Sequence, residues 1–181
     1  MGDHAERIAV PRADELRTDV AELLPLTAQP GREPARTMAV LARQPDLLGP
    51  FLGWAAALAL NGVLSHRDHE LLALRVASNC GSEFEWDEHA EYARGAGLTD
   101  AEIATVAGPV AGGSWSEAER ALLRAADELH SSTDVTDATW SVLSAHYDAP
   151  ALVEILFVVG QYTMLSMVAN AAGIPSDTGP A

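Results

Sequence analysis

The chain has 181 residues, 48% of them hydrophobic, so it is long and apolar enough for one domain with a substantial interior. Asp and Glu number 26 against 11 Lys and Arg, which gives a formal net charge of −15. This balance argues against nucleic acid and anionic membranes as partners, because both are bound through basic surface.

Cysteine content and the apolar stretches point to the cytoplasm. Cys80 is the single cysteine, so no internal disulfide can form, and the first residues, MGDHAERIAV, lack the apolar run of a signal peptide. The longest apolar stretches, 51–60 and 152–159, are shorter than the ~20 residues that cross a bilayer. We therefore expect both stretches to lie in buried core helices.

The N-terminal part is predicted to be a helix followed by a linker. Leu16, Val20, Leu23 and Leu24 recur at helical spacing, which predicts a helix over 13–24 that Pro25 ends. Residues 25–34 contain three prolines and a glycine, which is typical of a linker. We accordingly divide the chain into an N-terminal extension, residues 1–33, and a main domain, residues 34–181.

The main domain is predicted to be all-α, because no stretch alternates apolar and polar residues over any length. Apolar spacing and capping residues predict helices over 34–43, 46–60, 99–106, 117–130, 137–147 and 150–172, and two helices joined by a tight turn within 66–97. Trp54 is expected in the core. The last helix is apolar nearly all round and must be enclosed, and with the alanine-rich helix over 46–60 it predicts a homo-oligomer.

Three polar residues stand out where two predicted helices meet. Glu70 belongs to the first helix, while Glu85 and His89, one turn apart, share a face of the second, which Ser82 opens. Burial of Glu70 beside an apolar run would suit it to acid/base work. A structural interpretation is also open: Ser82 and Glu85 fit the capping box S-x-x-E, and His89 could be a solvated or ion-paired histidine.

Two other features were weighed as sites. His66 and His69 are three residues apart and could share a face, but no third well-spaced ligand accompanies them, so we predict no metal. Cys80 lacks the partner that a C-x-x-C redox motif needs and is expected to be a small buried residue.

Taken together, Glu70, the segment E-W-D-E-H from Glu85 to His89 and the segment A-R-G-A-G-L-T-D-A-E-I from Ala93 to Ile103 resemble the carboxymuconolactone decarboxylase family and its alkylhydroperoxidase D-like relatives. The resemblance covers roughly residues 35–172. In the peroxidase branch a glutamate faces a C-x-x-C-x-x-x-H segment, and the two cysteine positions fall here on Ser82 and Glu85. The resemblance implies an alkylhydroperoxidase D-like helical bundle and assembly into homotrimers or hexamers.

The residues and the resemblance together suggest a cofactor-free lyase-type enzyme that decarboxylates or isomerises a small organic acid or lactone. His89 would be the general acid/base, Glu85 its orienting partner and Glu70 a second proton carrier. Ser82 with the helix N-terminus would bind an anion, while Arg75 would pair with Glu70 or a substrate carboxylate, and Trp86 or Phe84 would wall the pocket. A thiol or peroxide-related antioxidant protein and a catalytically silent oligomeric binding module remain alternatives.

Overall fold

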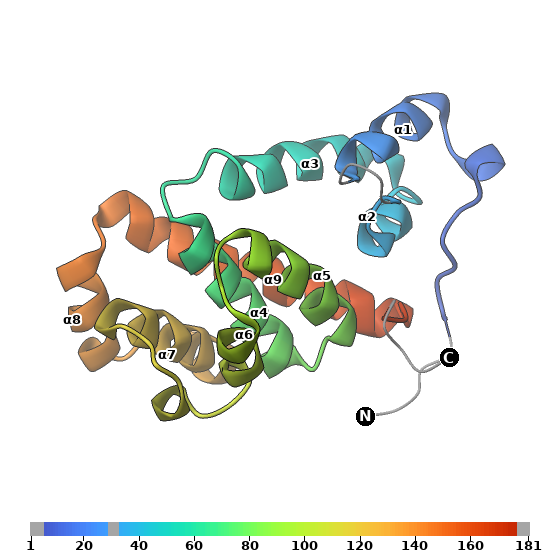
Figure 1. The fold of residues 1–181 in the computed structure, drawn as a ribbon. Coiled ribbons are helices and arrows are strands. Elements are labelled where there is room, and N and C mark those ends of the chain that lie inside the picture. The colour runs from blue at the N-terminus through green and yellow to red at the C-terminus, as the bar shows by residue number, and fades with distance from the viewer. Residues whose placement is uncertain (1–5, 29–32, 177–181) are drawn as a thin grey trace.

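The computed structural model describes residues 6–28 and 33–176, and these residues form helices joined by loops, without a strand (Figure 1). The prediction of an all-α fold is therefore confirmed. In chain order the elements are η1 (Ala13–Glu15), α1 (Thr18–Leu23), η2 (Leu24–Thr27), α2 (Arg36–Leu41), α3 (Pro45–Ala59), α4 (His66–Cys80), α5 (Glu83–Gly95), α6 (Asp100–Val106), η3 (Val110–Gly112), α7 (Glu117–Ser132), α8 (Asp137–His146) and α9 (Ala149–Ala172).

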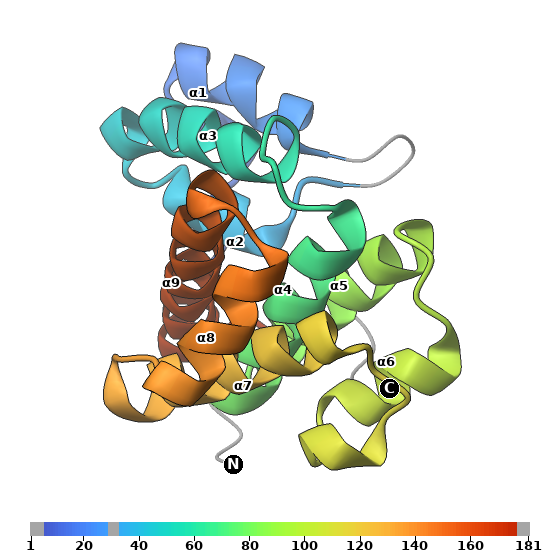
Figure 2. The ribbon, with the colours of Figure 1, turned by 90° about the vertical axis from the view of Figure 1, so that its left-hand side faces the viewer.

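Helix α4 is the centre of the main layer and contacts α5, α7 and α9 (Figure 2). Its residues 69–77 are all buried. Ser65 caps its start by accepting a hydrogen bond from the Asp68 amide, and Gly81 ends it in the left-handed conformation, at φ 60°. Side chains of α4 consequently face the neighbouring helices all round, which is why a polar residue on it, such as Glu70, lies inside the molecule.

Helix α9 runs the length of the bundle and contacts α4, α5, α7 and α8. Its 24 residues are long and apolar enough to cross a membrane, but ten of them are buried against the other helices, as in a core helix. The described part of the chain does not enclose α9 on every side. Phe157 is 50% exposed and Met167 63% exposed, and both lie on its outer face.

A second layer, made of α1, η2, α2 and α3, covers one side of the main bundle (Figures 1 and 2). Its small core consists of Val20, Ala42 and Leu48. The helix predicted over 13–24 is divided, because Leu16 is extended between η1 and α1. In the predicted linker, residues 24–27 form η2 instead, and residues 29–32 lie outside the described part.

Trp54 of α3 does not lie in the core, contrary to the prediction. Its side chain is 41% exposed and its ring meets that of Phe157 edge to face, with centroids 5.2 Å apart. Trp54 therefore belongs to an outward-facing apolar surface that α3 and α9 share.

The loop between α3 and α4 is fixed to α9 by a buried carboxylate. Glu154 accepts hydrogen bonds from the amides of Val63, at 2.6 Å, and Leu64, at 3.3 Å. Gly62 fits beside it because any Cβ there would collide with the carboxylate. This contact sets where the second layer lies over the main bundle.

Candidate active site

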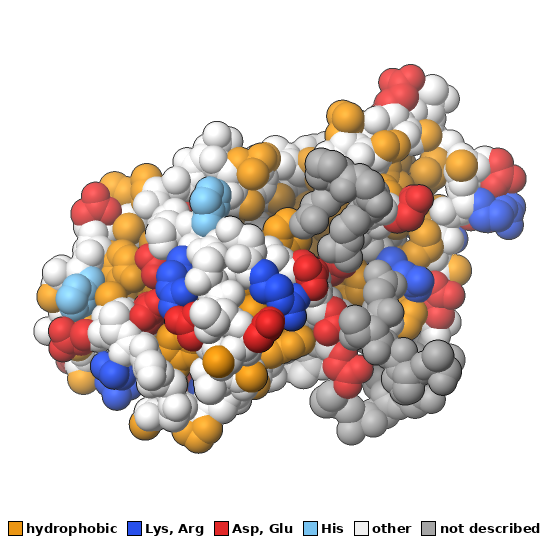
Figure 3. All heavy atoms as spheres, viewed as in Figure 1, with side chains coloured by type: hydrophobic (Ala, Val, Ile, Leu, Met, Phe, Trp, Pro, Cys, Tyr) orange, Lys and Arg blue, Asp and Glu red, His pale blue; other side chains and the backbone are white. Residues whose placement is uncertain are grey.

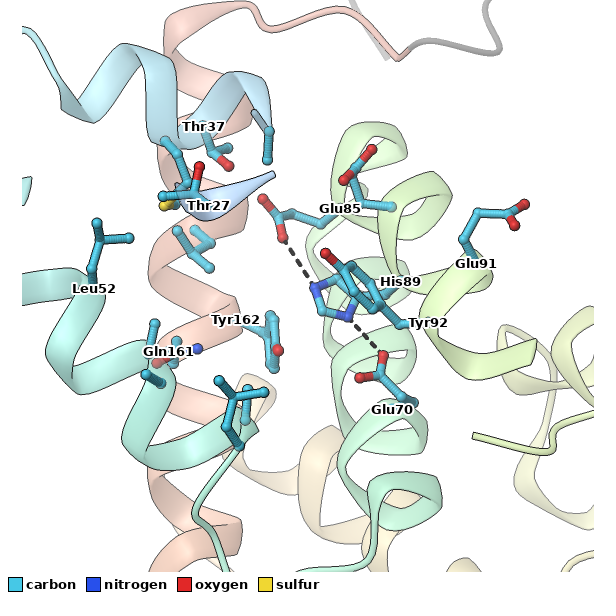
Figure 4. Close-up of a pocket in the computed structure, with 18 of the residues that line it drawn as sticks. Thr27, Thr37, Leu52, Glu70, Glu85, His89, Glu91, Tyr92, Gln161 and Tyr162 are labelled. Atoms are coloured by element: carbon cyan, nitrogen blue, oxygen red, sulfur yellow. Dashed lines mark hydrogen bonds and ion pairs between the residues drawn. The ribbon is translucent and has the colours of Figure 1, made fainter. Parts of the chain in front are cut away.

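Glu70 of α4 and Glu85 and His89 of α5 lie together, as the sequence predicted, and all three side chains are buried. His89 Nδ1 lies 2.8 Å from Glu70 Oε2 and donates a hydrogen bond to it. The other ring nitrogen, Nε2, lies 3.8 Å from Glu85 Oε2, which is an ion-pair distance but too long for a hydrogen bond. The imidazole is thus held between two carboxylates (Figure 4).

The start of α5 explains why Glu85 is available to the site. Ser82 is the N-cap and its Oγ accepts from the Glu85 amide at 3.5 Å, as the capping motif predicts. The reciprocal bond of a capping box is not formed, because Glu85 Oε1 is buried without a hydrogen-bond partner among the described residues. The carboxylate turns toward His89 instead of back to the helix start.

Burial and charge shift the proton affinities of both side chains. Burial raises the pKa of Glu85 to about 7, although the nearby His89 acts in the opposite direction. Burial by itself would lower the pKa of His89, but the charge and hydrogen bond of Glu70, together with Glu85 and Glu88, outweigh it and raise that pKa. The site therefore combines a carboxylic group close to half ionisation at neutral pH with an imidazole whose charged form the neighbouring carboxylates stabilise.

Two tyrosines enclose the imidazole, and the sequence reasoning did not find either of them in this role. The ring of Tyr162, from α9, meets that of His89 edge to face at a centroid distance of 4.4 Å. Tyr92, one turn after His89 on α5, lies 5.4 Å away. The Tyr162 hydroxyl also forms a hydrogen bond with His69 Nε2, at 2.8 Å. Burial raises the pKa of Tyr162 well above 10. A tyrosine inside the apolar α9 was the signal that could have shown it.

The site opens into a cavity of about 1110 Å³ between the two layers. One wall is polar and includes Glu70, Glu85, His89 and Tyr92. The opposite wall is largely apolar and is supplied by η2, α2 and α3 with the end of α1 (Figure 4). Its apolar members are Leu23, Leu26, Ala35, Met38, Phe51, Leu52, Ala55, Ala56, Ala59 and Leu60.

Gln161 is, like Thr37, a buried polar side chain of the cavity that sequence reasoning missed. It lies on α9 and is only 5% exposed, and its Oε1 has no hydrogen-bond partner within the part of the chain that the structure describes. Together with Glu85 Oε1, it gives the cavity a buried and unpaired polar atom on each of two walls. Such atoms are uncommon in folded proteins and indicate a bound group.

Arg75, predicted to bind Glu70 or a substrate carboxylate, does neither. Its guanidinium binds both carboxylate oxygens of Asp127, each at 2.6 Å, and the carbonyls of Val106 and Gly108. Arg75 leaves α4 on the side opposite the cavity, because α7 packs there and offers a carboxylate. It ties α4 to α7 and to the loop after α6.

Ser82 and Trp86 were the other predicted substrate contacts, and neither lines the cavity. Trp86 packs against the apolar cluster that includes Leu71 and Leu74, on the far face of α5. Ser82 is buried at the helix start, where its hydroxyl serves the backbone. Of the residues predicted to form the site, the fold brings Glu70, Glu85 and His89 together, and Phe84 lines the same cavity.

Cys80, at the end of α4, is also outside the cavity lining and is partly buried. Its Sγ lies 3.8 Å from His130 Nδ1, and burial raises the pKa of its thiol, which opposes formation of a reactive thiolate. His69, which we had weighed as a metal ligand, faces Tyr162. Within 6–28 and 33–176 no group of three or more His, Cys, Asp or Glu side chains is placed to hold a metal ion.

Comparison with known families and structures fits this architecture. Residues 45–128, which include Glu70, Glu85 and His89, match the model of the carboxymuconolactone decarboxylase family. An AhpD-core, peroxidase-related protein of Ralstonia eutropha is similar in structure, with TM-score 0.84, 18% identity and coverage of 97% of this chain and 94% of that one. An AhpD-type protein of Agrobacterium tumefaciens is similar in structure as well, with a TM-score of 0.70 and 21% identity. The similarity covers 76% of this chain and 95% of that one.

A third similar structure is that of the debrominase Bmp8 in complex with 2,3,4-tribromopyrrole, with TM-score 0.81 and 15% identity. The similarity covers 97% of this chain and 93% of Bmp8. At these identities the likeness establishes the alkylhydroperoxidase D-like fold. No protein of curated function matches the chain.

Proposed function

Since the segment that carries the site, residues 45–128, belongs to the carboxymuconolactone decarboxylase family, we propose that this protein is an enzyme that moves protons on a small molecule bound in the cavity. The observation that carries the proposal is the buried Glu70, His89 and Glu85 arrangement at the polar wall of that cavity. The reaction class is decarboxylation or isomerisation without a cofactor, the chemistry that such residues can perform by themselves.

The geometry supports a different division of roles from the one that the sequence suggested. Glu70 is the orienting residue, because it accepts the Nδ1 proton of His89 and so leaves Nε2 toward Glu85 and the cavity. His89 is the general acid, since Glu70 favours its charged form. Glu85 is the general base, because its raised pKa lies near the working pH and the residue lines the cavity.

A thiol or peroxide-related antioxidant activity is the alternative that the superfamily suggests, and the site supports it less. The disulfide relay of the peroxidase relatives needs two cysteines, and Ser82 and Glu85 stand at those positions. Cys80 is outside the cavity, with a thiol pKa that burial raises. A binding module without catalytic activity would account for the cavity, but it would not account for the raised pKa of Glu85.

The proposal is tested by deuterium exchange on enolisable lactones, ketones and small organic acids in D2O, followed by NMR. The protein should accelerate exchange beside the carbonyl group, and His89→Ala should lower the rate by ~10²–10⁴, the usual contribution of a positioned acid or base. Cys80→Ser is the matched control and should leave exchange within about twofold, whereas peroxide consumption that depends on Cys80 would favour the antioxidant alternative.

A further inference from the structure

We propose that the substrate of this site is an uncharged, enolisable lactone or ketone with a largely apolar body, which the enzyme isomerises. The inference rests on the acid/base function proposed above and narrows it in two ways. It selects neutral compounds over carboxylates, and it selects isomerisation over decarboxylation.

The first argument is the charge of the cavity. Four of its lining residues are glutamates, Glu70, Glu85, Glu88 and Glu91, whereas Arg67 is the one Arg or Lys among the described lining residues. The Arg67 guanidinium is already bound by Glu119, at 2.7 Å, and by Glu102. A substrate carboxylate would therefore meet like charge from these glutamates, and no guanidinium among the described lining residues is free to compensate it.

The second argument is the position of Arg75. A family member that binds a carboxylate needs a cation within reach, and Arg75 on α4 was the residue that could have supplied it. Its guanidinium is fully engaged with Asp127 and two backbone carbonyls away from the cavity. The same helix thus presents a carboxylate, Glu70, to the cavity and its buried guanidinium to α7.

The cavity also contains a neutral polar group suited to an uncharged ligand. Gln161 on α9 lines the cavity and supplies a neutral amide. Neutral amides bind hydroxyl, carbonyl and N–H groups without requiring charge. The facing wall from η2, α2 and α3 is apolar, so it accommodates a hydrophobic body rather than a second ionised group.

The spacing of the acid and the base fits an enolisable unit. A carbonyl oxygen lies about 2.4 Å from the adjacent carbon, given bond lengths of about 1.23 and 1.52 Å. Glu85 Oε2 and His89 Nε2 lie side by side, 3.8 Å apart. One residue can therefore reach the hydrogen on that carbon while the other reaches the carbonyl oxygen of the same substrate.

The reaction balances with these two residues. In a β,γ-unsaturated lactone or ketone, the Glu85 carboxylate takes the proton from the carbon beside the carbonyl group. The C–H electron pair forms a double bond to the carbonyl carbon, and the carbonyl oxygen takes the Nε2 proton of charged His89, which gives a dienol. The dienol then accepts the proton of Glu85 at its far carbon and returns its hydroxyl proton to His89. The double bond has moved into conjugation, both residues are restored, and no other reactant is needed. Decarboxylation, by contrast, begins with the carboxylate that this cavity disfavours.

The test uses one probe in two charge states: a β,γ-unsaturated γ-lactone with a carboxymethyl group, and its methyl ester. NMR titration at pH 8, where Glu85 is mostly ionised, gives Kd, and deuterium incorporation from D2O gives proton transfer. The ester should bind at least tenfold more tightly than the acid and become conjugated. Glu85→Gln should reduce the difference in Kd between ester and acid, because the acid binds more tightly. Gln161→Leu should weaken binding of the ester.

The two proposals fail in different ways. Equal or tighter binding of the acid, or release of CO2 from it, would overturn the neutral-substrate proposal, even if His89→Ala still abolished exchange. Failure of both probes to bind would contradict it as well. If instead the ester binds preferentially but its exchange is unchanged in both His89→Ala and Glu85→Gln, the acid/base function itself is wrong.

Discussion

The burial of Glu85 makes the stability of this chain depend on pH. Its pKa is about 7 in the folded protein and 4.5 without the fold, so the folded state binds an extra proton between these values. Stability must therefore fall as pH rises from about 4.5 to 7, and at pH 8 the buried charge costs on the order of 2–3 kcal/mol. The fold tolerates this cost at a residue of the proposed active site, as functional sites often do.

Glu85→Gln should consequently stabilise the protein at pH 8 while it abolishes activity. The amide keeps the shape and cannot ionise, and Ser82 still caps the backbone of α5. Thermal unfolding followed by circular dichroism should show a higher Tm than the parent at pH 8 and no gain at pH 4.5. A variant that is less stable than the parent at both pH values would mean that Glu85 is a structural residue.

His89 and Glu70 should control the basic limb of the rate profile. kcat/KM should rise as Glu85 loses its proton near pH 7 and fall at higher pH as His89 loses its own. Because Glu70 raises the pKa of His89, Glu70→Gln should move the basic limb to lower pH and leave the acidic limb in place. An unchanged profile in Glu70→Gln would exclude it as the orienting residue.

At the scale of the elements, the cavity needs the N-terminal layer. Leu23, Leu26 and Thr27 line it, although the sequence assigned them to an extension outside the main domain. Leu48 of α3 is fully buried, and it packs with Val20 of α1 and Ala42 in the core that holds this layer together. The position of the apolar wall that faces Glu70, Glu85 and His89 therefore depends on the packing of the small core around Leu48.

Leu48→Ala should raise KM several-fold and lower stability by about 2–5 kcal/mol, the usual cost of a large-to-small core change. Leu122→Ala, at a fully buried position in the main core, is the matched control. It should lower stability by a similar amount and leave KM of the folded enzyme unchanged. Kinetics and urea unfolding of the same preparations distinguish the two, and equal KM effects would disprove a separate role for the N-terminal layer.

Local signals predicted the helices well because capping residues act over one turn. Ser65, Ser116 and Thr136 each cap the helix that they were predicted to begin. Spacing along α5 likewise placed Glu85 and His89 on one face. The direction of Arg75 and the contact of Tyr162 with His89 could not be predicted, because they join residues about 50 and 70 positions apart along the chain.

At the scale of the whole molecule, charge and apolar surface are separated. Over α5 and α6, Arg side chains lie beside Asp and Glu, as with Arg94, Glu91 and Asp100, and form no basic patch on that face (Figure 3). The outer face of α9, by contrast, carries exposed Val153, Phe157, Met164 and Met167, and Trp54 of α3 joins Phe157. We call these five residues the α9 surface.

The α9 surface predicts that the protein assembles with itself. Large exposed side chains recur at intervals of three to seven residues and form a stripe along one helix. A second copy of the same chain is always present in solution and can cover this stripe. Light scattering after size exclusion should report a homo-oligomer at micromolar concentration. Phe157→Asp should shift it toward the monomer because the charge would be buried in the interface. Trp140→Asp, at a similarly exposed apolar position on α8, is the control and should leave the mass unchanged. A monomeric parent protein would contradict the prediction, and equal dissociation in both variants would place the interface elsewhere.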